Sequence, residues 1–319
     1  MTERPFYRQQ FCNDFEAYCD SVREWDLDYR PLESGSFASE RLSFGNSQFL
    51  FSHTKINRHL LQNGTIPKGL VTFGILANPG IKIHWRNADI KGDALFVFPP
   101  GGELNAISRA DFSVFPLSLS EQKLNQVCTL LELPEFRTLT NNTEVFRRSA
   151  QSLFELRQTL YYIEHLLLTG SDSSRNIQFL QEIEHTLAVK LVETLAEYSQ
   201  SDKRKSVRKR DVAINTAEAY IRENNGTSIA VPDLCSIANA SQRMLEYAFR
   251  ERYNMSPKAY IQALRINTAR KQLQKANPYT DQVTQIARHN GFSHMGQFGA
   301  YYKKMFGERP SDTLKHRTP

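Results

Sequence analysis

The fold is decided by residues 231–317, which read VPDLCSIANASQRMLEYAFRERYNMSPKAYIQALRINTARKQLQKANPYTDQVTQIARHNGFSHMGQFGAYYKKMFGERPSDTLKHR. This stretch contains one motif twice, because four positions of the first copy are matched 52 or 53 positions later: Cys235 by Ala287, Ser241 by Ser293, Phe249 by Tyr302 and Pro257 by Pro310. Each copy has the pattern of a short apolar helix, a turn and a second helix. A nearly constant offset, here with one inserted residue between Ser293 and Tyr302, is typical of duplicated supersecondary units. We therefore predict two helix-turn-helix units in one chain.

The elements of this module follow from its apolar and capping residues. A helix is predicted over residues 212–224, and Ser241 and Ser293 are predicted to cap the second helix of each unit. A linking helix over residues 256–274 would be about 28 Å long, at about 1.5 Å per residue. That length suits two recognition helices in successive major grooves, which lie about 34 Å apart along B-form DNA.

Charge is unevenly distributed along the chain. The whole sequence carries +6, whereas residues 203–319 carry 21 Lys and Arg against 9 Asp and Glu, a net charge of +12. Residues 1–202 carry 19 against 25, a net charge of −6. Because duplex DNA is a polyanion, the basic end is predicted to bind it. The basic residues 201–211 are predicted to form a solvated linker, with phosphate contact as the alternative.

A set of residues in the module is characteristic of one protein family: Arg265 and Ile266 with Ala269 and Leu273, then Ile286, Ala287, Gly291, Phe292, Ser293, Phe298, Phe306, Gly307 and Pro310. On these residues the chain, over about residues 212–317, resembles the AraC/XylS transcription regulators. Residues 245–249, 256–257 and 307–311 are also similar to the branch that contains the ethanolamine-operon regulator. The resemblance implies promoter DNA and RNA polymerase as partners, with an effector and dimerisation region before the DNA-binding domain.

The resemblance also implies which side chains read base edges. In the first unit these are Gln242, Arg243, Glu246 and Tyr247, and in the second His294, Met295, Gly296, Gln297 and Ala300. A bidentate pair between Arg243 and guanine would give about 1–3 kcal/mol of discrimination. The second set offers few hydrogen-bonding groups, so we predict that the first helix reads most bases and the second mainly docks. The expected phosphate contacts are Arg250, Lys303 and Lys304, and phosphate contact or plain exposure is the alternative for every reader.

Residues 1–119 have the pattern of a β-rich, cupin-like domain after a lead-in helix near residues 11–24. Short apolar runs between turn residues predict strands at 37–44, 48–57, 69–77, 81–85 and 94–98. Strands at this spacing favour a small antiparallel barrel or sandwich. Phe73, Trp85 and Phe96 either line a ligand pocket in this domain or form an ordinary core.

From residue 120 to 200 the apolar period becomes helical. Helices are predicted over 120–131, 143–168 and 176–198, and the two long ones are expected to form a hairpin. Their apolar stripes either pack within the chain or pair with a second chain as a dimer seam. Periodicity does not separate these two alternatives.

No constellation of catalytic or metal-binding residues stands out. A cupin-type metal site needs a His-x-His pair with a carboxylate, whereas His84 is followed by Trp85 and Arg86. The four cysteines contain no CxxC pair. Glu103, beside a Pro-Gly-Gly turn, is the strongest lone candidate for a catalytic acid, and one carboxylate does not make a site. We therefore predict no enzyme activity, no metal and no cofactor.

The expected fold is α+β, with an N-terminal antiparallel barrel or sandwich, a helical hairpin and an all-α double helix-turn-helix module over residues 212–319. No run of about 18 apolar residues predicts a membrane span, and the first residues predict no secretory signal, so a cytoplasmic protein is expected. The leading hypothesis is a sequence-specific, effector-responsive transcriptional activator, with a homodimer left open. The alternatives are an architectural or effector-independent DNA-binding protein and, least favoured, an enzyme.

Overall fold

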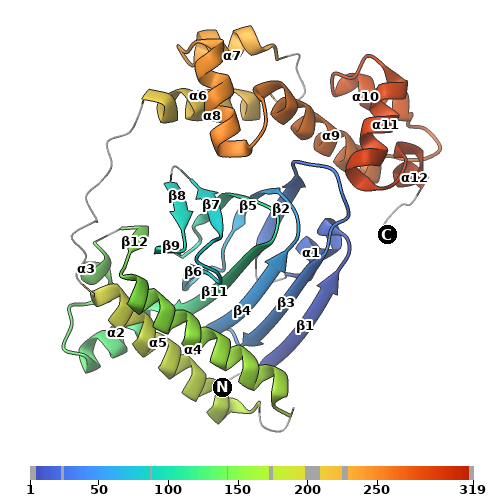
Figure 1. Ribbon diagram of the computed structural model, residues 1–319. Coiled ribbons are helices and arrows are strands. Elements are labelled where there is room, and N and C mark those ends of the chain that lie inside the picture. Colours follow the sequence, from blue (N-terminus) through green and yellow to red (C-terminus); the bar gives the residue numbers. More distant parts are fainter. Residues whose placement is uncertain are drawn as a thin grey trace. The chain divides into compact units, whose positions relative to one another are not determined.

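The computed structural model describes residues 5–22, 25–86, 88–98, 100–141, 143–171, 175–197, 209–224 and 229–315. They form two compact units: an N-terminal unit with most of the strand residues and the helices up to residue 197, and a C-terminal unit with the helices from residue 209, to which residues 30–36 and 59–61 also belong (Figure 1). The predicted α+β class is confirmed. Most of the predicted linker, residues 201–208, lies outside the described residues.

The strands of the N-terminal unit form two sheets. The larger sheet has the order β1-β3-β4-β11-β6-β9-β12, and the smaller has the order β2-β5-β10-β7-β8. The bounds are β1 Phe6–Cys12, β2 Asp26–Pro31, β3 Ser39–Gly45, β4 Phe49–Ile56, β5 Leu60–Thr65, β6 Leu70–Leu76, β7 Lys82–Trp85, β8 Ala88–Lys91, β9 Ala94–Phe98, β10 Glu103–Ser108, β11 Phe112–Ser120 and β12 Val145–Arg147. Every pair with a described register is antiparallel. The described strands thus correspond to the sandwich of the prediction rather than to a single closed barrel.

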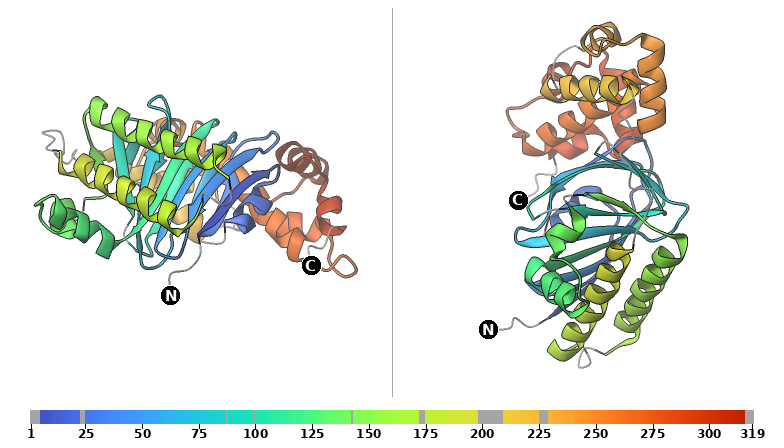
Figure 2. Two further views of the ribbon diagram at one scale, coloured as in Figure 1. Left: turned by 90° about the horizontal axis from the view of Figure 1, so that it is seen from below. Right: turned by 90° about the vertical axis from the view of Figure 1, so that its left-hand side faces the viewer.

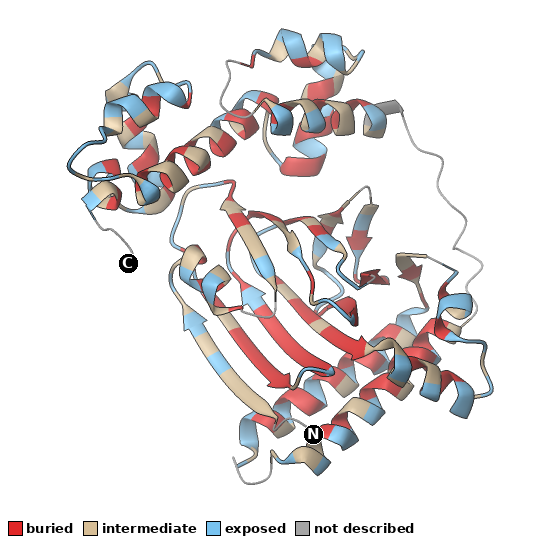
Figure 3. Cartoon of the chain, turned by 180° about the vertical axis from the view of Figure 1, so that it is seen from behind, coloured by how far each residue is buried: buried red, intermediate tan, exposed pale blue. Residues whose placement is uncertain are grey.

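Side chains alternate between the two faces of the larger sheet, as the pleat of a strand requires. On β4 and β11 one face carries Ser52, Thr54 and Val114 toward the smaller sheet. The other face carries Phe51, Phe115 and Leu117 into the main hydrophobic core. Strand β4 is consequently buried at every position except Lys55 (Figure 3), although Ser52, His53 and Thr54 at its centre are polar.

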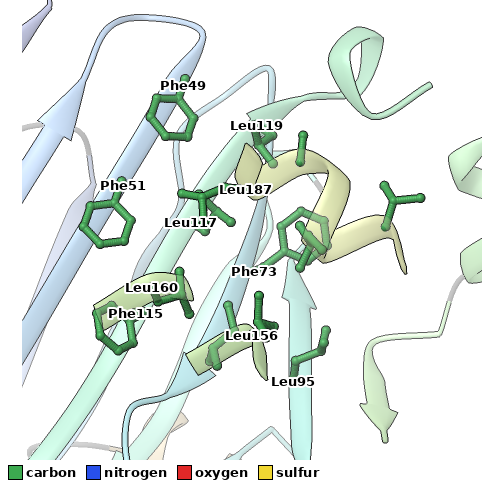
Figure 4. Packing of buried hydrophobic residues seen from close by; sticks show 14 of the residues in the cluster. Phe49, Phe51, Phe73, Leu95, Phe115, Leu117, Leu119, Leu156, Leu160 and Leu187 are labelled. Carbon is green, nitrogen blue, oxygen red and sulfur yellow. The ribbon is translucent and has the colours of Figure 1, made fainter. Parts of the chain in front are cut away.

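Helices cover that second face of the larger sheet. Their bounds are α2 Glu121–Leu130, α3 Phe136–Thr140, α4 Ala150–Thr169 and α5 Ile177–Ala196, and α4 and α5 lie side by side across the strands (Figures 1 and 2). Leu156 and Leu160 of α4 and Leu187 of α5 point toward Phe115 and Leu117 of β11 (Figure 4). The buried stripes of both long helices therefore pack within the chain, which the periodicity alone had left open.

Two helix predictions in this unit are wrong at their N-terminal ends. The lead-in helix near residues 11–24 is shorter, α1 Phe15–Ser21, capped by Asp14, and the residues before it form strand β1. The helix predicted from residue 143 begins only at Ala150, after the Ser149 cap, because residues 145–147 pair with β9 as strand β12. Phe146 fits the apolar spacing of a helix, but it lies in strand β12 and its ring packs in the main hydrophobic core from there.

The C-terminal unit contains seven helices in its described residues: α6 Lys209–Glu223, α7 Val231–Ile237, α8 Gln242–Tyr253, α9 Pro257–Lys275, α10 Val283–His289, α11 Met295–Phe306 and α12 Pro310–Lys315. The pairs α7–α8 and α10–α11 are the two predicted helix-turn-helix units, and α9 links them. The caps Ser241 and Ser256 accept from the N–H groups of Met244 and Ala259 at 3.3 and 3.2 Å.

The predicted cap Ser293 is wrong. The N-cap of α11 is His294, which makes no side-chain capping hydrogen bond. Helices α7 and α10 begin 52 residues apart, whereas α8 and α11 begin 53 residues apart. The extra residue of the second copy is therefore His294 itself, which occupies the cap position and leaves the serine one residue outside the helix.

Candidate functional site

A largely buried ionic network joins the inner side of helix α8 to helix α6. Arg252 Nη1 donates to Glu218 Oε1 of α6 and to Asn215 Oδ1, both at 2.7 Å. The Tyr253 hydroxyl donates to the same Glu218 oxygen. Burial raises the pKa of Tyr253 well above its usual value, so its hydroxyl stays a donor. Leu245 and Phe249 complete the buried side, which fixes the opposite side of α8 outward.

That outward side carries the predicted readers of the first unit. Gln242, Arg243, Tyr247 and Arg250 are exposed, and the Tyr247 side chain is 65% exposed. Glu246 is half-buried and its Oε1 accepts from Gln242 Nε2 at 3.1 Å. A carboxylate oriented in this way beside Arg243 presents both a donor and an acceptor at the first turns of the helix. Such an array can hydrogen-bond to base edges in a major groove.

The second unit presents a different surface. Phe298 and Tyr302 of α11 are buried, and the Tyr302 hydroxyl lies 2.8 Å from Thr313 Oγ1 of α12. His294, Gly296, Gln297 and Ala300 are exposed, whereas Met295 is half-buried. Lys303 and Lys304 are exposed in the last turn of α11. Both recognition helices, α8 and α11, are packed through aromatic residues on their inner sides. The two units therefore differ mainly in the side chains that they expose, as the sequence indicates.

The linking helix contributes residues that sequence reasoning missed. Lys258, Gln262 and Arg265 lie on one face of α9 and line a groove of about 330 Å³ with the turn before α11. Sequence reasoning treated α9 as a spacer. The spacing of these polar residues, four and three positions apart, was the available signal, because it places them on one helix face.

A cavity of about 50 Å³ lies between the two sheets of the N-terminal unit. Apolar lining comes from Trp25, Ile83, Phe96, Phe98 and Leu104, and polar lining from Tyr18, Tyr29, Arg41, Ser52, Thr54, Gln62 and Thr72. Arg41 is only 2% exposed, and its Nη2 donates to Ser52 Oγ at 3.3 Å. Burial raises the pKa of both tyrosines, so both hydroxyls can donate hydrogen bonds. None of the described lining residues is Asp or Glu.

The three predicted pocket residues differ in their positions. Phe96 lines the cavity from β9. Phe73 borders it, but its ring belongs to the core on the opposite face and lies 6.0 Å from the Phe136 ring. Trp85 is not among the described lining residues and packs behind Phe96 and Phe98, with ring centroids 5.2 and 5.0 Å away.

Beside the cavity, one histidine joins the sheet to α4. His53 Nδ1 lies 2.7 Å from Glu164 Oε1, and His53 Nε2 lies 2.8 Å from Ser113 Oγ. The imidazole also stacks on the Phe115 ring at 4.0 Å. The Ser-His-Glu order resembles a hydrolase triad, but the His53 imidazole is only 2% exposed and is covered by the Phe115 and Tyr161 rings. We therefore assign the three residues to fastening α4. Among the residues that the structure describes, no group of His, Cys, Asp and Glu is arranged to hold a metal ion.

Comparison with known proteins gives the C-terminal unit clear relatives. Residues 234–316 match the family model of a helix-turn-helix domain. The XylDLEGF operon transcriptional activator 2 of Pseudomonas putida is 34% identical over 130 residues, which are 40% of this chain and 80% of that protein. Activator 1 of the same operon is 36% identical over 98 residues, 31% of this chain, and the chain covers 30% of that protein's length. A probable AraC family transcriptional regulator from Rhodopseudomonas palustris, a solved structure, is 33% identical over 34% of this chain and 98% of that one, with a TM-score of 0.31.

Proposed function

Because this chain belongs to the AraC/XylS family of transcriptional regulators, we propose that it is a sequence-specific DNA-binding regulator that places α8 and α11 in successive major grooves. The observation that carries the proposal is the pair of outward recognition helices at the ends of α9, in a segment with a net charge of +12. We further propose that it acts as an activator through RNA polymerase in the cytoplasm. Residues 245–249, 256–257 and 307–311 support placing it in the branch of the ethanolamine-operon regulator.

A selection experiment tests the DNA-binding proposal. The full chain is used to enrich duplexes from a random library, and the affinity for the enriched duplex is measured from 50 to 200 mM salt. Several phosphate contacts should make log K fall linearly with log salt, by about 0.9 for each phosphate neutralised. Affinity that is independent of salt, or no preference over random DNA, would remove the proposal. Binding sites scattered across a genome instead of at promoters would favour an architectural protein.

We propose that the cavity between the sheets binds a small organic anion as effector. The support is its lining, which combines the Arg41 guanidinium and the hydroxyls of Tyr18 and Tyr29 with the aromatic rings of Trp25, Phe96 and Phe98. A cavity of about 50 Å³ holds a few water molecules at about 10–15 Å³ each. The fitting ligand is therefore short, or else moves side chains to enter.

The change Arg41→Gln should remove the response to carboxylates. Short carboxylates and benzoate are compared with their neutral amides in thermal shift measurements on the full chain, because a ligand that binds the folded state raises its stability by RT ln(1 + [L]/Kd). We expect the carboxylates alone to raise the midpoint of the wild type. Arg109→Gln, at an exposed arginine outside the described lining, is the control. Equal responses to acids and amides would exclude an anion-selective cavity.

We propose that the chain forms homodimers through the outer face of α4. Phe154, Tyr161 and Leu168 are 54%, 39% and 46% exposed and recur every seven residues, the period of a helix–helix seam. Phe154→Glu should therefore shift the sedimenting species toward the monomer, whereas Leu130→Glu, at an equally exposed apolar side chain of α2, should not. A wild type that sediments as a monomer at all concentrations would contradict the proposal.

A further inference from the structure

We propose that the groove along the linking helix α9 seats the sugar-phosphate backbone of the DNA strand that runs between the two major grooves. This inference rests on the proposed DNA-binding function and goes beyond it, because it assigns the linking helix a direct part in binding. The groove is lined by three parts of the C-terminal unit: residues 229–231 at the start of α7, one face of α9, and residues 291–298 at the start of α11.

The chemistry of the groove suits an anionic strand. Lys258 is exposed on α9, and Gln262 follows it one turn later on the same face. Arg265 lies deeper, and burial lowers the pKa of its guanidinium, which nevertheless remains protonated at neutral pH. None of the described residues that line the groove is Asp or Glu. A phosphate here would meet two cations and the amide donors of Gln262 and Gln297.

The turn before α11 is shaped so that it can approach Arg265 closely. Gly291 has a φ of +80°, and a Cβ at this position would lie 3.3 Å from the Arg265 guanidinium carbon. Only glycine adopts this backbone conformation without strain and leaves the guanidinium in place. The linking helix and the second unit are thus in contact at the groove, and its two walls form one continuous surface.

A nucleic acid fits the groove better than an acidic protein segment, because two predicted base readers line the same wall. His294 and Gln297 border the groove at the N-terminal turn of α11. A duplex whose major groove receives this turn must bring a backbone strand past His294, and α9 is the next surface that this strand meets. The length of α9, 19 residues or about 28 Å, is close to the spacing of two major grooves.

The test uses two variants of α9 with opposite changes of charge: one removes a positive charge from the groove and the other adds one. Lys258→Gln should lower the slope of log K against log salt by about 0.9, and Gln262→Lys should raise it by about the same amount. Between 50 and 200 mM salt this corresponds to a change of about threefold in relative affinity for each variant. The probe is the duplex enriched from the random library. Gln181→Lys, on an exposed position of α5 in the N-terminal unit, is the matched control and should leave the slope unchanged.

Neutral methylphosphonates, placed one at a time along the enriched duplex, locate the contact. One or two positions between the two recognition sites should weaken binding of the wild type, and Lys258→Gln should lose this sensitivity. If both variants keep the wild-type slope while Arg243→Ala still loses base preference, the groove proposal is overturned and DNA recognition stands. If Lys258→Gln keeps DNA binding and slope but abolishes transcription with purified polymerase, the occupant is a protein, and the proposal is again overturned. Failure to enrich any duplex removes the proposed function itself.

Discussion

Replacing Glu218 by alanine is expected to destabilise the C-terminal unit by about 3–5 kcal/mol, because it leaves the Arg252 charge buried without its carboxylate. The Arg252 and Glu218 side chains are 5% and 15% exposed, so little water can replace the lost partner. The Tyr253 hydroxyl loses its acceptor in the same step. Since this network fixes α8 against α6, DNA binding should be lost together with the fold of the first helix-turn-helix unit.

The position of the tryptophans makes this prediction specific. Both tryptophans, Trp25 and Trp85, belong to the N-terminal unit. Glu218→Ala should therefore shift the helical circular dichroism transition and leave the tryptophan fluorescence transition in place. Glu223→Ala, at an exposed position of the same helix, is the control. If Glu218→Ala shifts the transition by no more than this control, the network contributes nothing measurable to stability.

Arg243→Ala is expected to relax base specificity by about 1–3 kcal/mol, or roughly 5- to 150-fold between the enriched duplex and its variants. Arg243 is exposed at the first turn of α8, where a guanidinium can reach a guanine edge. The measurement is the affinity for the enriched duplex and for single-base variants at fixed salt. The effect should concentrate at one base pair, because a bidentate contact spans one base.

Lys304→Ala provides the contrast, because its side chain lies in the last turn of α11. A phosphate contact carries no direct sequence information, so this variant should weaken all duplexes alike and lower the salt slope by about 1. Equal losses on every duplex for both variants would show that Arg243 is also a backbone contact.

The C-terminal unit was largely predictable because its signals are local. The prolines and the serine caps at Ser241 and Ser256 mark helix ends, and the offset of the two copies places the second unit from the first. The prediction fails at Ser293 because two signals disagree there. The serines Ser241 and Ser293 are 52 residues apart, whereas the helices α8 and α11 begin 53 residues apart. Only the backbone conformation shows which of two adjacent residues is the N-cap.

The N-terminal unit was less predictable because its order depends on pairing between distant residues. Strand β1 has an alternating half-exposed pattern, and it becomes a strand by pairing with β3. Strand β12 has only three residues, and β9 holds it in place. The cavity was harder still, because Arg41, Tyr18 and Gln62 come from separate elements. An aromatic residue in the sequence, such as Trp85, can line a cavity or pack behind the residues that line it, and its position in the sequence does not show which.

Strand β4 joins the cavity to α4 through three successive residues. Ser52 and Thr54 border the cavity, whereas His53 between them holds Glu164 of α4. These side chains share one short piece of backbone, so we expect a molecule that displaces the two cavity residues to move the imidazole as well. If the proposed effector moves these two cavity residues, we therefore expect the change to reach α4 directly through β4, without movement of a loop.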